Sequence, residues 1–231
     1  SDGRITPIVV ARGNHERSNS TISKLFDTRE GVYYSLSFAR NLLKAFVLNS
    51  ESSLVGDQLE WLKKDLAASE ESIWKIGLYH RPMRPHTEKK SENDRLYQAW
   101  APLFYKHGVN LVVESDSHTV KTTYLIRPSF TAGHEEGFVR DDENGTVYVG
   151  EGCWGAPLRE SNDDKSWTRS SGSFNQFKWI HLDKTAMDIR TIAVDNADQV
   201  GSVDDDSRFE LPENLRVWSP KEGDVVTLQS R

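Results

Sequence analysis

The chain of 231 residues has a single cysteine, Cys153, so it can form neither an internal disulfide bond nor a metal site built from several thiolates. It also lacks long hydrophobic runs, and the longest, such as ITPIVVA near the start, fall far short of the roughly 20 apolar residues that cross a bilayer. Basic residues are fewer than acidic ones, with 29 Lys and Arg against 35 Asp and Glu, so the net charge is −6. The composition therefore predicts no membrane segment and argues against an extended nucleic-acid surface.

Aromatic residues are plentiful, with seven Trp, seven Tyr and nine Phe, which is typical of a folded domain and not of a disordered chain. The length allows one domain with a full core. From about residue 196 the chain becomes acidic and loop-like, with three aspartates at 204–206. We therefore predict one domain over residues 1–195 and an acidic carboxyl-terminal extension over residues 196–231, either packed on the domain or acting as a linker.

Hydrophobic periodicity predicts alternating strands and helices, which indicates an α/β fold. Leu59, Leu62 and Leu66 recur at helical spacing, and Asp57 with Glu60 resembles a capping box. Pro102 is expected to bend or divide the second helix. The predicted helices are 57–68 and 93–107. The predicted strands are 5–10, 32–38, 45–49, 74–79 and 110–113, followed by 122–126, 146–150, 177–182 and 187–194 in a second sheet.

Three of these strands end on clusters of potential metal ligands. Asn14 and His15 follow the first strand, His80 follows the strand at 74–79, and Asp116 and His118 follow the strand at 110–113. Open α/β sheets place their sites at such strand ends, so we expect the three loops to converge. Oxygen and nitrogen donors of this kind suit hard or borderline metal ions.

The motif Gly13-Asn14-His15-Glu16 after a hydrophobic strand resembles the GNHD/GNHE signature of the calcineurin-like metallophosphoesterases. The segments that follow resemble the purple acid phosphatase branch of that family in their order, over roughly residues 5–155. They are QLEWLKKDL, a strand ending in HRPM, YKHGVNLVV leading to a His-containing loop, and GTVYVGEGCWGAP.

The resemblance implies a two-layer β-sandwich flanked by helices and a metal-bound hydroxide that hydrolyses phosphate mono- or diesters at a dinuclear site. The cofactors would be two divalent or mixed-valence ions, Mn, Fe or Zn. By the same resemblance, Asn14 and His80 would ligate the second metal and His118 the first. His15 would be the catalytic residue that donates a proton or hydrogen bond toward the phosphoryl oxygens or the leaving group.

Two departures from the family pattern stand out. Its GHxH loop reads Ser115-Asp116-Ser117-His118, so Asp116 replaces a histidine ligand and favours harder ions such as Mn or Mg over Zn. The DxH and GD motifs that should precede Gly13 are missing, together with the first strands. The chain therefore resembles the carboxyl-terminal portion of the domain, and we expect a preceding segment or a second chain to supply those motifs. The alternative is a degenerate, non-catalytic binding or scaffold module.

Several assignments stay open at the level of sequence. Asp116 is about as consistent with a capping or solvated aspartate as with a metal ligand. Arg81 lies beside a ligand and could bind the phosphoester substrate, although a surface salt bridge fits it better. His86 could also bind substrate, but a mobile surface histidine is the simpler interpretation. The residues do not determine the compartment, and the family resemblance slightly favours a secreted or periplasmic protein.

Overall fold

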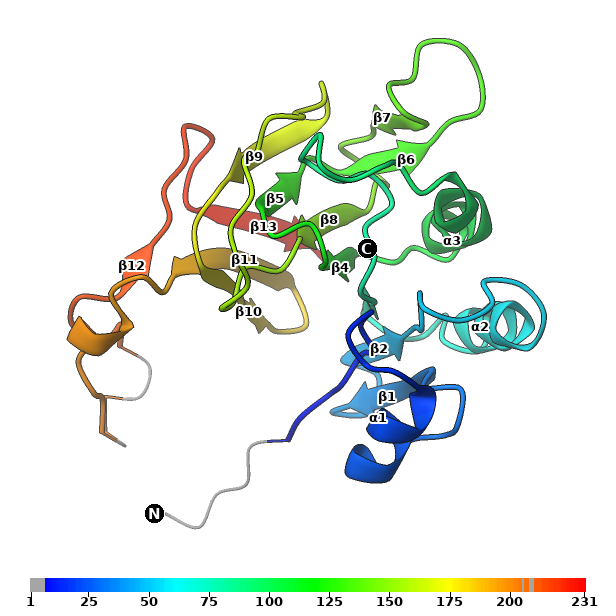
Figure 1. The fold of residues 1–231 in the computed structure, drawn as a ribbon, viewed down its shortest axis with the longest axis horizontal. Helices are drawn as coiled ribbons and strands as arrows, with labels where there is room; N and C mark the ends of the chain where they lie inside the picture. Colours follow the sequence, from blue (N-terminus) through cyan, green and yellow to red (C-terminus); the bar gives the residue numbers. More distant parts are fainter. Residues whose placement is uncertain (1–6, 205, 208–209) are drawn as a thin grey trace.

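Two β-sheets pack face to face, and two helices cover the outer side of the larger sheet (Figure 1). The computed structural model describes residues 7–204, 206–207 and 210–231. Within that part of the chain, no helix is long and apolar enough to span a membrane. The arrangement confirms the predicted α/β fold, a two-layer β-sandwich flanked by helices.

The larger sheet has seven strands in the order β1-β2-β3-β4-β8-β5-β9. Strands β2, β3, β4 and β8 run parallel to one another, whereas β1, β5 and β9 are antiparallel to their neighbours. The strands are β1 (Tyr34–Phe38), β2 (Leu43–Val47), β3 (Trp74–Leu78), β4 (Leu111–Glu114), β5 (Val120–Thr123), β8 (Val147–Gly150) and β9 (Thr168–Gly172).

The second sheet contains β10 (Gln176–Leu182), β11 (Ala186–Ala193), β12 (Arg216–Val217) and β13 (Val225–Gln229). The predicted strands 177–182 and 187–194 are confirmed as β10 and β11, which pair as an antiparallel hairpin. The prediction that 122–126 and 146–150 also belong to this sheet is wrong, because β5 and β8 pair with each other in the larger sheet. Residues 122–126 are also split, since Ile126 begins β6 (Ile126–Pro128), which pairs with β7 (Phe138–Arg140) in a separate hairpin.

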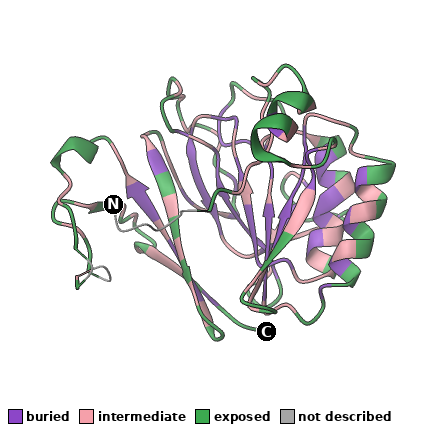
Figure 2. Ribbon diagram, turned by 90° about the horizontal axis from the view of Figure 1, so that it is seen from below, coloured by how far each residue is buried: buried purple, intermediate pink, exposed green. Residues whose placement is uncertain are grey.

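Successive side chains of the central strands point to opposite faces of the larger sheet, so the sheet has one hydrophobic core on each face. In β4, Leu111 points to the second sheet, where it packs with Met187 of β11, while Val112 points to the helices. The helix side is filled by buried residues such as Trp100 and Phe104. Figure 2 shows the inner faces of the helices buried and their outer faces exposed.

The predicted helices are confirmed as α2 (Asp57–Ala67) and α3 (Asp94–Lys106). Asp57 does not form a capping box, because Gly56 is the residue before the helix and no side chain caps it. Asn93 caps α3 through a 3.2 Å hydrogen bond from the Leu96 amide, and Pro102 lies inside the helix without dividing it. The short helix α1 (Asn19–Phe26) was not predicted.

The predicted first strand is wrong for residues 7–10, which form no strand, while residues 5–6 lie outside the described chain. The backbone of Val10 is instead held by the Tyr34 hydroxyl, which accepts from its amide at 3.0 Å and donates to its carbonyl at 2.7 Å. Ile8 is exposed. A β-branched run forms a strand only where another strand supplies hydrogen-bond partners, and the described residues supply none here.

The carboxyl-terminal part of the chain, beyond residue 196, adds two strands to the second sheet. It contains a short 3-10 helix (Ala197–Gln199) and the strands β12 and β13, and β13 pairs along β11 from Ala186 to Arg190. This end of the predicted extension is thus packed on the domain. The boundary at residue 195 stays a prediction.

Candidate metal centre

Three side chains from the three predicted loops meet in one place. The Asn14 Oδ1 atom lies 3.0 Å from Nε2 of His80, and that nitrogen lies 3.4 Å from Oδ1 of Asp116. The side-chain nitrogen Nδ2 of Asn14 donates to the same Asp116 oxygen at 3.3 Å. Residues 66 and 102 positions apart therefore form one cluster of donor atoms.

The parallel pairing of β3 with β4 produces this convergence. Leu78 is in register with Val113, so the two strands end side by side. The pairing continues past the strands, since the Tyr79 amide donates to Val113 and the Ser115 amide donates to the His80 carbonyl at 2.8 Å. His80 and the loop carrying Asp116 must therefore leave the same edge of the sheet together.

Charged residues within the loop around Asn14 brace its shape. The Glu16 carboxylate accepts from the Gly13 amide at 2.6 Å, and Arg12 donates to the Glu16 carbonyl at 2.9 Å. A β-carbon at Gly13 would lie 3.2 Å from the His80 ring, so this glycine permits the close approach of the loop to the ligand.

Asp116 is the most enclosed member of the cluster, with 6% of its surface exposed. Its backbone is left-handed, with φ of 70°, a conformation that aspartate tolerates better than most residues. Lys90 donates to its Oδ2 atom at 2.7 Å. Burial would raise the pKa of the Asp116 carboxyl, but hydrogen bonds from His80 and Lys90 outweigh it and lower that pKa below its ordinary value.

His118 lies on the same loop, also with a left-handed backbone at φ of 60°. Its Nδ1 atom is 2.8 Å from the carbonyl oxygen of Pro157. A histidine that donates from Nδ1 to a carbonyl keeps Nε2 available as a ligand, the pattern seen behind most metal-bound histidines. His118 does not form a three-ligand cluster within 4.8 Å with His80 and Asp116.

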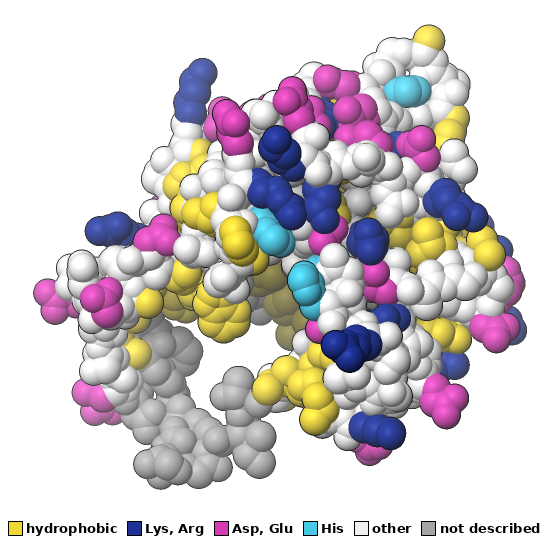
Figure 3. Space-filling view, viewed as in Figure 1, with side chains coloured by type: hydrophobic (Ala, Val, Ile, Leu, Met, Phe, Trp, Pro, Cys, Tyr) yellow, Lys and Arg dark blue, Asp and Glu magenta, His cyan; other side chains and the backbone are white. Residues whose placement is uncertain are grey.

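His15 and Arg81 flank the cluster. The His15 side chain is exposed and makes no hydrogen bond to another described residue. Arg81 forms a bidentate ion pair with Glu51, with Nε at 2.6 Å and one terminal nitrogen at 2.9 Å. Figure 3 shows histidine side chains beside several Lys and Arg side chains near the middle of one face of the molecule.

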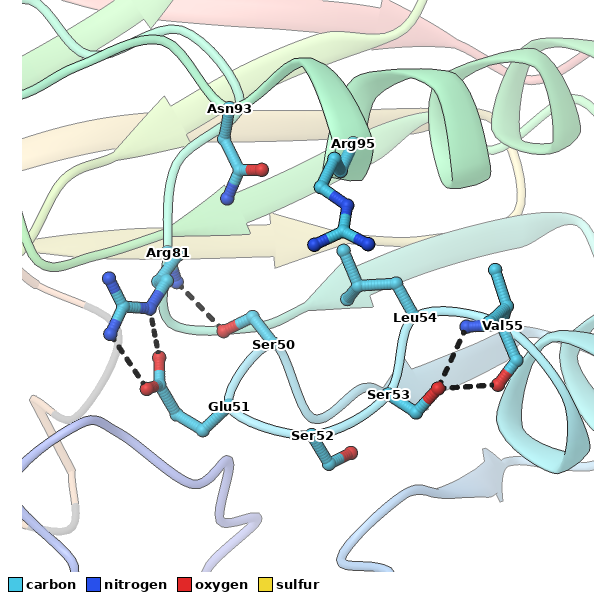
Figure 4. Close-up of a pocket in the computed structure, with 9 residues that line it drawn as sticks. All are labelled: Ser50, Glu51, Ser52, Ser53, Leu54, Val55, Arg81, Asn93 and Arg95. Carbon is cyan, nitrogen blue, oxygen red and sulfur yellow. Dashed lines mark hydrogen bonds and ion pairs between the residues drawn. The ribbon is translucent and has the colours of Figure 1, made fainter.

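The ion pair of Arg81 forms one wall of a polar pocket of about 420 Å³ (Figure 4). The Arg81 amide donates to the Ser50 hydroxyl at 3.0 Å, which ties the loop after His80 to the loop after β2. Arg95 and Asn93 line the opposite side. With Glu51 as its partner, Arg81 matches the salt-bridge interpretation, and its role toward substrate stays a prediction.

His86 is fully buried, so the interpretation as a mobile surface histidine is wrong. Its backbone amide donates to Glu151 at 3.1 Å, and its Nε2 atom lies 2.7 Å from the Thr168 hydroxyl. Burial lowers the pKa of the ring to about 4, so it is neutral at pH 7. The structure does not bring His86 to the cluster around Asn14.

Beneath the loops lies a buried ionic network that the sequence did not reveal. The Lys121 ammonium is 2.6 Å from both Glu114 and Glu151, and all three side chains are at most 2% exposed. Glu114 also accepts from the Tyr79 hydroxyl at 2.7 Å and from the Met83 amide at 2.9 Å. The network thereby joins the ends of β3, β4 and β8 directly behind the site.

A family model described as calcineurin-like phosphoesterase matches residues 2–120, slightly more than half of the chain. The chain belongs to the calcineurin-like phosphoesterase family. Membership supports phosphoester hydrolysis at a metal site in general. The matched residues include the motif that begins at Gly13 and the two loops that carry His80 and Asp116.

Known proteins of this family are similar over part of their length. Purple acid phosphatase 15 of Arabidopsis thaliana is 26% identical over 140 residues, which cover 52% of this chain and 26% of that protein. Purple acid phosphatase PPD1 of yellow lupin (Lupinus luteus) has a similar structure, with a TM-score of 0.64 and 17% identity, over 88% of this chain and 33% of that one. The chain thus spans about a quarter to a third of these relatives.

A further similar structure is GAP50, described as the anchor in the inner membrane complex of Plasmodium. Its TM-score is 0.54 at 11% identity, and the match covers 82% of this chain and 55% of that one. At these identities the two structural matches show the fold alone.

The donor set fits one of the two metal ions that calcineurin-like phosphoesterases hold. An ion about 2.1 Å from each ligand, at angles of 90° to 109°, keeps neighbouring ligand atoms about 3.0 to 3.4 Å apart. Asn14, His80 and Asp116 show 3.0 and 3.4 Å between their donor atoms. For the other ion, His118 is the candidate ligand among the described residues near the site.

Another acidic cluster, formed by Glu92, Glu136 and Asp163, has three carboxylate atoms within 4.8 Å of one another. The buried Lys165 ammonium occupies it, at 2.6 Å from Asp163 and 3.4 Å from Glu136. Arg84 also reaches the cluster, with its Nε atom 3.4 Å from Glu92, so these carboxylates already take part in a network of ion pairs with two basic side chains.

Two residues that the sequence did not single out help to shape the site. Lys90 pairs with Asp116, and Arg159 donates from one guanidinium nitrogen to the carbonyls of Asp116 at 3.0 Å and Ser117 at 3.2 Å. Neither belongs to a recognisable motif. Charged residues in loops are common, so only the folded structure could single them out.

Proposed function

We propose that the protein hydrolyses phosphate mono- or diesters at a dinuclear metal site whose second ion is held by Asn14, His80 and Asp116. The observation that carries the proposal is the convergence of these three side chains, with Nε2 of His80 3.0 Å from Oδ1 of Asn14 and 3.4 Å from Oδ1 of Asp116. Bound ions would acidify water and neutralise the phosphoryl oxygens. The carboxylate of Asp116 supports Mn among the candidates Mn, Fe and Zn.

The side chains of this chain would have distinct roles. His15 is adjacent to Asn14 and exposed, so its ring can reach a bound substrate and donate a proton to the leaving group or a hydrogen bond to a phosphoryl oxygen. His118 would ligate the first ion through Nε2, with its orientation set by the Pro157 carbonyl. Arg81 would bind substrate only after release from Glu51, so we assign it a secondary part.

A preceding segment or a second chain would supply the remaining carboxylates. Two observations support this part of the proposal. Residues 7–10 lack strand partners among the described residues, and β10 lies at an edge of the second sheet with Phe177 and Trp179 exposed. Strand edges with unpaired backbone groups are normally covered or otherwise protected. The resemblance that implies this segment also slightly favours a secreted or periplasmic protein.

A degenerate, non-catalytic module is the second candidate function. It is favoured by the loss of the GHxH pattern, in which Asp116 stands in place of the first histidine. Such a module would still bind phosphate or a protein partner but would not turn substrate over.

Substitution of His15 separates the two candidates. We expect His15→Ala to lower the rate of hydrolysis of an aryl phosphate monoester or diester by about 100-fold or more, in the chain assayed together with its preceding segment. His181→Ala is the matched control, because His181 is exposed on β10 away from the cluster. Equal activity of both variants and the unaltered protein would remove the catalytic assignment.

A further inference from the structure

We propose that Lys90 is the counter-cation of Asp116, restoring to the site the positive charge that the Asp116 carboxylate removes and so preserving its affinity for phosphate. The inference rests on the proposed function, because it assumes that an anionic phosphoryl group binds beside Asn14 and His80. It concerns a residue outside every motif described above.

The geometry of Lys90 is specific. Its ammonium lies 2.7 Å from Oδ2 of Asp116, whereas Oδ1 of the same carboxylate faces Asn14 and His80. One oxygen is therefore directed at the candidate ion and the other is held by the lysine. The two cations would share the carboxylate without occupying the same position.

The loop that carries Lys90 is anchored in the core, so the ion pair does not depend on a freely moving side chain. The Lys90 amide donates to the Thr87 carbonyl at 3.1 Å, and Thr87 is fully buried. The preceding His86 is bonded through its amide to buried Glu151. Only 25% of the Lys90 side chain and 6% of the Asp116 side chain are exposed.

Charge balance gives this contact a functional consequence. A neutral histidine at position 116 would leave the full charge of the ions for the substrate, whereas a carboxylate subtracts one unit. A lysine bonded to that carboxylate adds the unit back at almost the same place. A single charge at this range, only partly screened by solvent, changes the affinity for an anion by about tenfold.

The test measures two affinities by calorimetry, for Mn²⁺ alone and for inorganic phosphate at saturating Mn²⁺. In Lys90→Met, we expect phosphate binding to weaken about tenfold and Mn²⁺ binding to tighten by about the same factor, because Asp116 loses its competing cation. Lys89→Met is the matched control. It removes the same charge from an exposed neighbour that forms no ion pair with a described residue, and both affinities should stay within about twofold.

The double variant Lys90→Met with Asp116→Asn decides the mechanism. If Lys90 acts by balancing Asp116, removing both charges should return phosphate affinity to within about threefold of the unaltered protein. A persistent tenfold loss would mean that Lys90 binds phosphate directly and would overturn the proposal. Unchanged phosphate affinity, or unchanged or weaker Mn²⁺ affinity, in Lys90→Met would overturn it as well.

A second variant keeps the test valid if Lys90→Met does not fold. Asp116→Asn alone leaves Lys90 without its partner, so phosphate binding should tighten while Mn²⁺ binding weakens, and the opposite result would overturn the proposal. These binding outcomes are independent of turnover. If no phosphoester is hydrolysed and yet both affinities change as expected, the proposed hydrolysis fails and the role of Lys90 stands.

Discussion

The Nε2 atom of His80 lies 3.0 Å from the side-chain oxygen of Asn14, although 66 positions separate the two residues. The contact joins the loop after residues 7–10 to the carboxyl end of β3, and Asp116 joins it from β4. The three side chains lie in three separate loops outside the helices and strands, so each can be substituted without changing a residue of those elements. This makes the cluster well suited to substitution.

We expect the 231-residue chain to bind about one Mn²⁺ ion and to lose it when either ligand is removed. His80→Ala and Asn14→Ala each delete one of three donors, which should weaken binding at least tenfold. Elemental mass spectrometry after equilibration with Mn²⁺ measures the ratio, with His181→Ala as the control. Two ions per chain would show that ligands beyond those named here complete the first site.

Lys121→Met should destabilise the protein by about 3 to 5 kcal/mol, because it leaves Glu114 and Glu151 buried without their shared cation. Urea unfolding at pH 7 measures the change. Lys63→Met is the matched control, since Lys63 pairs with Glu60 at 2.8 Å on the exposed surface of α2 and should cost less than about 1 kcal/mol. Similar losses in the two variants would contradict the assigned importance of the buried network.

His86 should make the protein sensitive to mild acid. Burial lowers the pKa of its ring to about 4 from an ordinary value of 6.5, so the unfolded chain binds a proton that the folded state refuses. The stabilisation is complete above pH 6.5 and is lost as the pH falls toward 4, by up to about 3 kcal/mol.

The matched variant is His86→Gln, which cannot be protonated in this range. Urea unfolding at pH 7, 5.5 and 4.5 should show the unaltered protein losing more stability than the variant. Parallel curves for the two proteins would mean that another group causes the acid sensitivity.

The free energy of unfolding of Glu92→Gln, relative to that of the unaltered protein, should be higher at pH 8 than at pH 5. Burial and the neighbouring Glu136 raise the pKa of the Glu92 carboxyl to about 8, so the folded state binds a proton that the unfolded chain releases above pH 4.5. Stability from this group is therefore present below pH 4.5 and is lost as the pH rises toward 8.

The amide variant lacks this loss, and we expect its stability relative to the unaltered protein to rise by on the order of 1 kcal/mol between the two pH values. Thermal unfolding at pH 5 and pH 8 measures it. Glu88→Gln, an exposed residue on the same loop, should show no such change.

Helices and central strands could be predicted because their signal is local. The spacing of Leu62 and Leu66 and the short apolar runs at β3 and β4 record which face of each element is buried. The strand predicted at residues 7–10 was wrong because a strand depends on its neighbours, which no local pattern reveals. The assignment of β5 and β8 to the wrong sheet has the same cause, since pairing is a long-range property.

The fold family and the candidate ligands can be predicted from the sequence, because Gly13-Asn14-His15-Glu16 and the polar ends of two parallel strands are short patterns of local chemistry. The charge around those ligands is set by folding. It paired Lys90 with Asp116, bound Arg81 to Glu51, and enclosed His86 behind the site. Charged side chains reach across loops far apart in the chain, and their partners are set by packing, which exists only once the chain has folded.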